Sequence, residues 1–83
     1  MYRLEISHIA HKQIDALPHR FARRINETIA GLANEPRPVG AKKLMGRDGY
    51  RIRVGDYRIL YVVDDISRLA TVYRVKHRRE VYR

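Results

Sequence analysis

Arginines dominate the stretch of this sequence where the side chains best suited to chemistry are gathered. Arg51 and Arg53 alternate with apolar residues, and Arg58 follows a Gly55-Asp56 pair. A guanidinium group stays protonated at physiological pH and presents several N–H donors in one plane, an arrangement that suits phosphate oxygens. These three arginines therefore predict a site that binds a phosphate or a similar oxyanion.

The spacing around Gly55-Asp56 predicts which of these side chains share a face. Gly followed by a second loop residue is typical of a β-hairpin turn, and a two-residue loop fixes the strand register. Arg53 then lies opposite Arg58, and Arg51 lies two residues further along the same strand, so all three point the same way. Opposed like charges are locally destabilising, and a bound anion would relieve that cost. The alternative is that the long side chains spread into water, where salt screens the repulsion.

The arginines do not supply a proton carrier. If the bound phosphate belongs to RNA, the neighbouring 2′-OH can attack it and cleave the strand. This reaction needs a base for the proton of the 2′-OH, cations for the charge on the phosphorane, and an acid for the leaving 5′ oxygen. Arginine, with a pKa above about 12, is a poor base. His77 and Tyr82, in the tail 76–83, are the candidates. Equally, His77 could be a surface imidazole and Tyr82 a ring packed on the sheet edge.

The charge of the chain is strongly positive and unevenly distributed. There are 18 Lys and Arg against 9 Asp and Glu, a net of +9; residues 42–83 hold 12 and 5 of these (+7), and residues 1–41 hold 6 and 4 (+2). Such a basic half favours a polyanion as partner, nucleic acid first, although an acidic protein would satisfy the same charge. The candidates for RNA or ribosome contacts are Lys42, Lys43, Lys76, Arg79 and Arg83. Lys42 and Lys43 are equally consistent with ordinary surface lysines.

Several other classes of site are excluded or weak. The absence of cysteine excludes disulfides and thiolate chemistry. His8 and His11 are three residues apart, but no carboxylate pair near them completes a zinc site, and no glycine-rich loop of the Walker type is present. We therefore expect neither a metal nor a cofactor. No apolar run approaches about 18 residues and the N-terminus lacks a signal-peptide core, so we expect a cytoplasmic protein.

Periodicity predicts the elements of the N-terminal half. Residues 2–7 alternate as a half-buried strand, and Ser7 is placed to cap a helix over 8–17. A second helix over 19–33 carries apolar residues at spacings of three and four, and the proline-rich segment 34–38 ends it.

The C-terminal half reads as strands. Residues 39–46 form a connector with a short strand at 42–45, followed by the hairpin 50–61 and a further strand over 68–75. The register of that last strand is not fixed, because both of its faces carry apolar residues. The tail is either the end of that strand or a turn of helix. The chain is therefore expected to form one α+β domain over 1–83, with the order β-α-α-β-β-β. Two N-terminal helices pack on a twisted antiparallel sheet of about four strands.

These segments together resemble a known family. KKLMG at 42–46, YRIRVGDYRILYVV at 50–63 and VKHRREVYR at 75–83 are similar to the RelE/ParE superfamily of toxins from prokaryotic toxin–antitoxin systems. The ending Glu80-Val81-Tyr82 resembles the RelE branch. RelE-like toxins are ribosome-dependent endoribonucleases that cut mRNA in the A site by 2′-OH attack without a metal.

The resemblance implies partners and alternatives as well as a function. It implies the ribosome, mRNA and an antitoxin that covers the basic surface of the toxin. The neighbouring ParE branch inhibits DNA gyrase on a similar scaffold, so a gyrase inhibitor is an alternative. A non-catalytic RNA-binding module is a third.

The resemblance also implies site residues. The basic residues of the family before the turn match Arg51 and Arg53, and its arginine after the turn matches Arg58. Its basic residue near the C-terminus matches Arg78, with Lys76 and His77 as alternatives, and its tyrosine matches Tyr82. Several RelE proteins carry lysine at the first two positions. Because this chain has arginine there, we expect the proton carrier in the tail, at His77 or Tyr82. The implied catalytic set is Arg51, Arg53, Arg58, His77, Arg78 and Tyr82.

Overall fold

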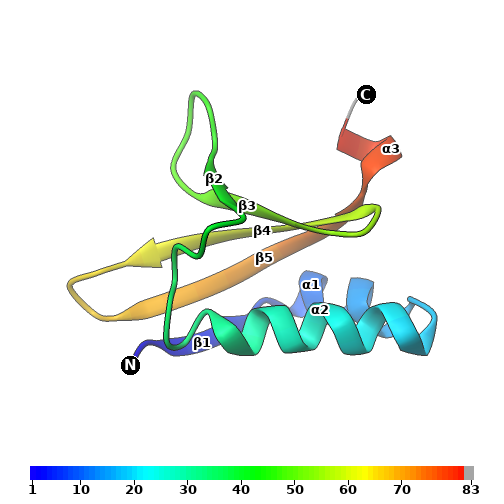
Figure 1. Ribbon diagram of the computed structural model, residues 1–83, viewed down its shortest axis with the longest axis horizontal. Helices are drawn as coiled ribbons and strands as arrows, with labels where there is room; N and C mark the ends of the chain where they lie inside the picture. Colours follow the sequence, from blue (N-terminus) through cyan, green and yellow to red (C-terminus); the bar gives the residue numbers. More distant parts are fainter. Residues whose placement is uncertain (82–83) are drawn as a thin grey trace.

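A computed structural model describes residues 1–81 of the chain, with the side chains of residues 1–79. Five strands form one sheet in the spatial order β1-β5-β4-β3-β2, and α1 and α2 cover one of its faces (Figure 1). The predicted α+β class and element order are confirmed, with five strands instead of about four. The elements are β1 (Arg3–Ile6), α1 (His8–Asp15), α2 (His19–Gly31), β2 (Ala41–Lys43), β3 (Tyr50–Val54), β4 (Tyr57–Asp64), β5 (Leu69–His77) and α3 (Arg78–Val81).

The sheet is mixed because β1 and β5 run parallel. Arg3 pairs with Leu69 and Ile6 with Val72, whereas all other neighbouring strands are antiparallel. The prediction of a wholly antiparallel sheet needs this adjustment. Because α1 and α2 carry the chain from β1 at one edge to β2 at the other, the last strand fills the place beside β1 and runs in its direction.

The two helices pack as their sequences predict. Ser7 caps α1 by accepting a hydrogen bond from the Ala10 N–H at 3.1 Å. Helix α2 begins directly after Pro18 and buries Ile25 and Ile29 against the sheet. Both helices end two residues earlier than predicted. Within residues 1–81, none of the helices has the length and apolar character that a membrane crossing requires.

The hairpin of β3 and β4 has the predicted register. Ile52 pairs with Ile59, and Arg53 pairs with Arg58. Gly55 opens the two-residue turn with a φ of +59°, a left-handed conformation that glycine adopts at little cost. The isoleucines belong to the buried core under the helices, so the arginines point to the opposite face.

A β-bulge in β5 explains why its register could not be predicted. Leu60 pairs with Arg74, but the next residue of β4, Tyr61, pairs with Val72, so Tyr73 is an extra residue in β5. Val72 is buried before the bulge and Val75 after it. Each half of the strand alternates regularly, but the extra residue exchanges the two faces between the halves.

The N-terminal segment satisfies the backbone groups that the bulge exposes. The Ser7 hydroxyl donates to the Tyr73 carbonyl at 3.2 Å, and the Gln13 side-chain oxygen accepts from the Val75 N–H at 2.7 Å. Strand β1 pairs with β5 only as far as Val72, so side chains at the start of α1 replace strand pairing beyond that point.

Candidate phosphate-binding face

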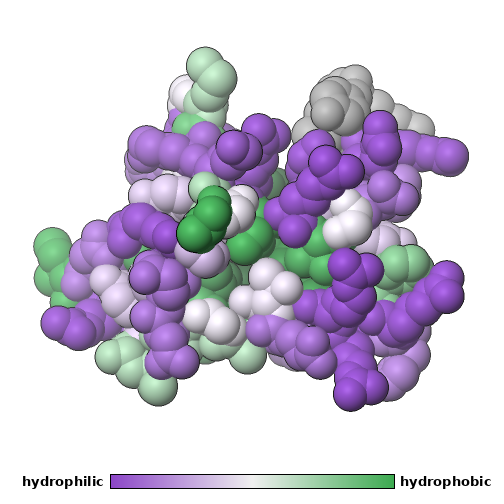
Figure 2. All heavy atoms as spheres, viewed as in Figure 1, coloured by the Kyte–Doolittle hydropathy of each residue, from purple (hydrophilic) through white to green (hydrophobic). Residues whose placement is uncertain are grey.

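On the face of the sheet opposite the helices, strands β2 to β5 carry six basic side chains, which we call the basic face. Directly opposed residues share a face, and the pairing of β2 to β5 brings all six to this side. Figure 2 shows hydrophilic residues around a hollow between the β2 end of the sheet and α3. The basic face consists of Lys42, Arg51, Arg53, Arg58, Arg74 and Lys76.

Three of these cations form a first row across adjacent strands. Arg53 of β3 pairs with Arg58 of β4, which pairs with Lys76 of β5. Neighbouring strands are about 4.8 Å apart, so three positive charges start within about 10 Å of sheet. The Arg53 Nε donates to the Gly55 carbonyl at 3.0 Å, which holds this guanidinium beside the turn.

A second row lies two residues further along the same strands. Lys42 of β2 pairs with Arg51, which pairs with Leu60, which pairs with Arg74 of β5. Leu60 is only 5% exposed although it points away from the helices. The aliphatic parts of long basic side chains can cover an apolar neighbour in this way while their charged ends remain in water.

A small pocket joins the two rows. It has a volume of about 160 Å³ and is lined by Gly40, Lys42, Arg51, Arg53 and Arg58. This is about five times the volume of one water in the liquid, enough for a phosphate group. Within residues 1–79, no carboxylate lies in ion-pair contact with Lys42, Arg51, Arg53, Arg74 or Lys76. An arrangement of this kind binds an anion and stabilises negative charge that develops on it.

The structure brings some of the predicted residues together and adds one. Arg51, Arg53 and Arg58 share a face, as predicted, and Lys42 and Lys76 join them. Arg74 was missed, because the only signal for its direction is the bulge. Lys43 lies on the other face, with its Nζ 5.7 Å from the centre of the Tyr50 ring.

His77 does not lie on the basic face. It pairs with Tyr57, and its ring meets the Tyr57 ring edge-on at 5.2 Å and 88°. Tyr57 in turn contacts Phe21 of α2 at 5.4 Å, on the helix-covered side. The Nδ1 of His77 accepts a hydrogen bond from the Arg79 N–H at 3.2 Å. The imidazole therefore stabilises the start of α3 and points away from the first row.

Arg78 is tied to the hairpin turn. Its N–H donates to the Asp56 carbonyl at 2.7 Å, and its Nη1 lies 3.8 Å from the Asp56 Oδ1. A separate hollow next to α3 is lined by Asp56, His77, Arg78 and Arg79. The predicted positions Tyr82 and Arg83 lie outside the described residues, so their roles stay predictions. In the part of the chain that the structure describes, no three of His, Asp or Glu are grouped to hold a metal ion.

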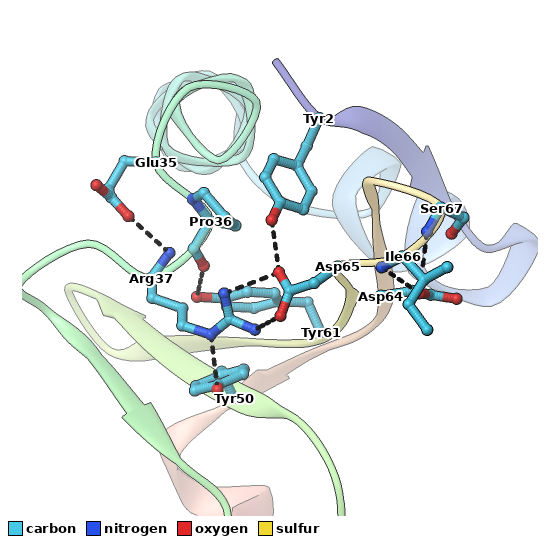
Figure 3. Close-up of polar contacts among 10 residues, drawn as sticks. All are labelled: Tyr2, Glu35, Pro36, Arg37, Tyr50, Tyr61, Asp64, Asp65, Ile66 and Ser67. Carbon is cyan, nitrogen blue, oxygen red and sulfur yellow. Dashed lines mark hydrogen bonds and ion pairs between the residues drawn. The ribbon is translucent and has the colours of Figure 1, made fainter.

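A second arginine site lies elsewhere on the sheet, and we call it the Arg37 cluster (Arg37, Asp65, Tyr2 and Tyr50; Figure 3). The Arg37 guanidinium donates to both carboxylate oxygens of Asp65, at 3.2 and 2.8 Å, and its Nε donates to the Tyr50 hydroxyl at 2.8 Å. The Tyr2 hydroxyl donates to the same carboxylate. Arg37 and Tyr2 lower the pKa of Asp65, and the carboxylate raises the pKa of Tyr2.

A buried tyrosine, Tyr61, packs against this cluster. Tyr61 is fully buried, stacks on the Tyr50 ring at 5.7 Å, and donates its hydroxyl to the Pro36 carbonyl at 2.7 Å. Burial raises the pKa of Tyr61 to about 12, so it acts as a neutral donor. Next to Asp65, the Ser67 and Ile66 N–H groups lower the pKa of Asp64. The contacts join the N-terminus, the proline-rich connector and the β4–β5 loop.

Comparison with known proteins identifies the family. The family model described as ParE toxin of type II toxin-antitoxin system, parDE, matches residues 4–82. The chain belongs to the RelE/ParE toxin superfamily. Toxin RelG of Mycobacterium tuberculosis is 33% identical to it over 86 residues, which cover 99% of this chain and 97% of RelG.

Solved structures agree with this assignment. The toxin–antitoxin complex RelBE2 of Mycobacterium tuberculosis matches with a TM-score of 0.81 and 28% identity, over 92% of this chain and 96% of the matched chain. The archaeal RelE–RelB complex from Pyrococcus horikoshii matches with a TM-score of 0.80 and 31% identity, over 93% and 94%. The protein is therefore a RelE/RelG-like toxin of a type II toxin–antitoxin system.

Proposed function

We propose that the toxin is a ribosome-dependent endoribonuclease that cleaves mRNA in the ribosomal A site, by metal-independent attack of the 2′-OH. The observation that carries this proposal is the basic face, where six cations from four strands point to one side. The similarity to RelG and to RelE structures supports it. Cleavage would inhibit translation and arrest growth.

In this proposal the first row binds the phosphate that is cleaved. Arg53 and Arg58 donate to its non-bridging oxygens and stabilise the extra charge of the phosphorane. The 2′ oxygen forms a bond to phosphorus and loses its proton to a base, while the bond from phosphorus to the 5′ oxygen breaks and that oxygen takes a proton from an acid. Guanidinium groups supply the charge in this scheme but not the protons.

The tail supplies the proton carrier in this proposal. His77 packs on Tyr57 on the opposite face and its Nδ1 is engaged by the Arg79 N–H. These contacts favour Tyr82 as the group that transfers a proton and give His77 the role of positioning α3. Arg78 would reach the substrate by exchanging Asp56 for a phosphate, because an exposed ion pair of this kind contributes little stability.

We also propose a cognate antitoxin, the ribosome and mRNA as partners, in the cytoplasm. The matched solved structures from Mycobacterium tuberculosis and Pyrococcus horikoshii are complexes of toxin and antitoxin. An antitoxin with an acidic segment would neutralise the toxin by covering the basic face.

The test is cleavage on programmed ribosomes, with the 5′ ends of the products mapped. Wild-type protein should cut in the A-site codon, and Arg58→Ala should lower the rate by about 100-fold or more, the usual effect of removing one charge-stabilising donor. Arg23→Ala is the matched control, because Arg23 is an exposed arginine of α2 that pairs with Glu27. Intact mRNA in cells whose growth is arrested would contradict the proposal.

A ParE-like gyrase inhibitor is the second candidate, because the matching family model carries the ParE description. It predicts DNA cleavage complexes of gyrase that persist with Arg58→Ala and Tyr82→Phe. A non-catalytic RNA-binding module predicts salt-dependent RNA binding without growth arrest or cleavage.

A further inference from the structure

We infer that the second row is a separate subsite for the phosphate next to the one that is cleaved, so that the basic face binds two successive phosphates of one RNA strand. This inference rests on the proposed nuclease function. Its new elements are Arg74 and the distinct environment that Leu60 creates at the centre of this row.

The register separates the rows by a constant step. Two residues along a strand correspond to about 6.6 Å, and the step is the same on β3 (Arg51 to Arg53), β4 (Leu60 to Arg58) and β5 (Arg74 to Lys76). A sugar and its two bridging oxygens separate successive phosphates of one strand, and this unit spans a distance of the same order as the step between the rows. The two rows can therefore bind neighbouring phosphates of one strand.

The two rows differ in how closely their charges lie. In the first row Arg53, Arg58 and Lys76 occupy adjacent strands. In the second row Lys42 and Arg51 occupy adjacent strands, but Leu60 separates Arg51 from Arg74 by two strand spacings, about 10 Å. Concentrated charge suits a phosphorane, which carries more negative charge than a phosphodiester. Separated charge suits a phosphodiester held from both sides.

The chemistry of the face favours RNA over an acidic peptide. Four of the six cations are arginines, whose planar N–H donors fit phosphate oxygens in pairs. The pocket is lined by residues of both rows, so one strand can pass from the first row to the second without leaving the surface. A phosphate also has oxygen acceptors that point in several directions. It can therefore accept hydrogen bonds at the same time from cations on three adjacent strands.

The experiment measures binding of a 2′-O-methyl oligoribonucleotide, which cannot be cleaved, to the full chain between about 50 and 200 mM salt. Arg74→Gln removes the positive charge and keeps an unbranched side chain as far as Cδ at the position paired with Leu60. The slope of log affinity against log salt should become shallower by about 0.7, the value for one lost single-strand phosphate contact. Arg3→Gln on β1, at the edge of the sheet furthest from β2, removes the same charge and should leave the slope nearly unchanged.

A second measurement separates this subsite from the reacting one. In the ribosomal cleavage assay, Arg74→Gln should raise KM several-fold with kcat retained, because the neighbouring phosphate is bound equally in the ground and transition states. Arg58→Ala should lower kcat instead.

Wild-type slopes and a wild-type KM for Arg74→Gln would overturn the inference, as would absence of RNA binding by the wild-type chain. Equal binding of a polyglutamate peptide with the same dependence on Arg74 would assign the row to an acidic protein and overturn it too. A changed slope without any ribosomal cleavage would refute the proposed nuclease and leave the two-phosphate surface standing.

Discussion

Arginine is used in two ways on the two faces of this sheet. In the Arg37 cluster, the guanidinium donates to both oxygens of Asp65 and to the Tyr50 hydroxyl, with a third group, Tyr2, on the same carboxylate. On the basic face, Arg53 lies opposite Arg58, and its Nε donates to a backbone carbonyl of the turn. One arrangement joins distant parts of the chain, and the other collects like charge.

The groups that surround an arginine therefore indicate its role in this protein. A guanidinium paired with a carboxylate contributes to folding and has little capacity left for a ligand. Opposed arginines oppose folding slightly, and a bound anion can recover that cost. The basic face should therefore lose activity without losing stability when it is altered, and the Arg37 cluster should do the reverse.

The largest expected effect is that variants of the two arginine sites lose different properties, activity in one case and stability in the other. Arg53→Ala should lower kcat for ribosomal mRNA cleavage by about 100-fold, because one donor to the phosphorane is lost, and should leave urea unfolding unchanged. Arg37→Ala should cleave like the wild type and unfold at lower urea. An Arg37→Ala protein that stays folded but is as inactive as Arg53→Ala would remove the distinction.

The next largest effect concerns the support of the Arg37 cluster. Tyr61→Phe should lower the free energy of unfolding by about 1 kcal/mol, because the Pro36 carbonyl loses its partner in a buried place. Tyr57→Phe is the control, since the Tyr57 hydroxyl makes no hydrogen bond within the described residues. Equal losses for the two variants would show that the hydroxyl of Tyr61 has no special role. Urea unfolding at neutral pH measures both.

Acid should weaken the Arg37 cluster selectively. The pKa of Asp65 is lowered in the folded protein by Arg37 and Tyr2. A lowered carboxyl pKa stabilises the fold above the unfolded value of about 4, and this contribution disappears as the pH falls through the folded value. Asp65→Asn should therefore be less stable than the wild type near neutrality, with a gap that narrows in acid. Unfolding curves across this range test it, and a gap independent of pH would contradict it. Asp48→Asn, which removes the same charge outside the cluster, is the control.

The smallest effect should be a gain in stability on the basic face. Arg53→Thr removes an opposed like-charge pair and places a β-branched residue in a strand, so the free energy of unfolding should rise by a few tenths of a kcal/mol. Added inorganic phosphate should raise the melting temperature of the wild type more than that of the variant. A variant less stable than the wild type would show that Arg53 contributes to folding after all.

The sequence pattern predicted the hairpin but only part of the basic face. A two-residue turn allows one register, so the directions of Arg51, Arg53 and Arg58 followed from local pattern alone. Arg74 did not follow, since its direction depends on the bulge at Tyr73.

Contacts between distant segments were also beyond the sequence pattern. The Arg37 cluster joins residues up to 63 positions apart, and no periodicity links Tyr2 with Asp65. The pairing of Arg78 with Asp56 likewise depends on how the end of β5 passes the hairpin turn. The separation of His77 from the arginines follows from the same strand, through its pairing with Tyr57.

The single extra residue in β5 has a consequence for chain length. Counted from Val72, a regular strand would send residues 74 and 76 toward the helices and Val75 outward, so the bulge alone brings Arg74 and Lys76 to the basic face. Deleting one residue there would exchange the two surfaces of the second half of the strand without changing its composition. When related toxins are aligned, a one-residue gap at Tyr73 therefore indicates that different side chains lie on the basic face.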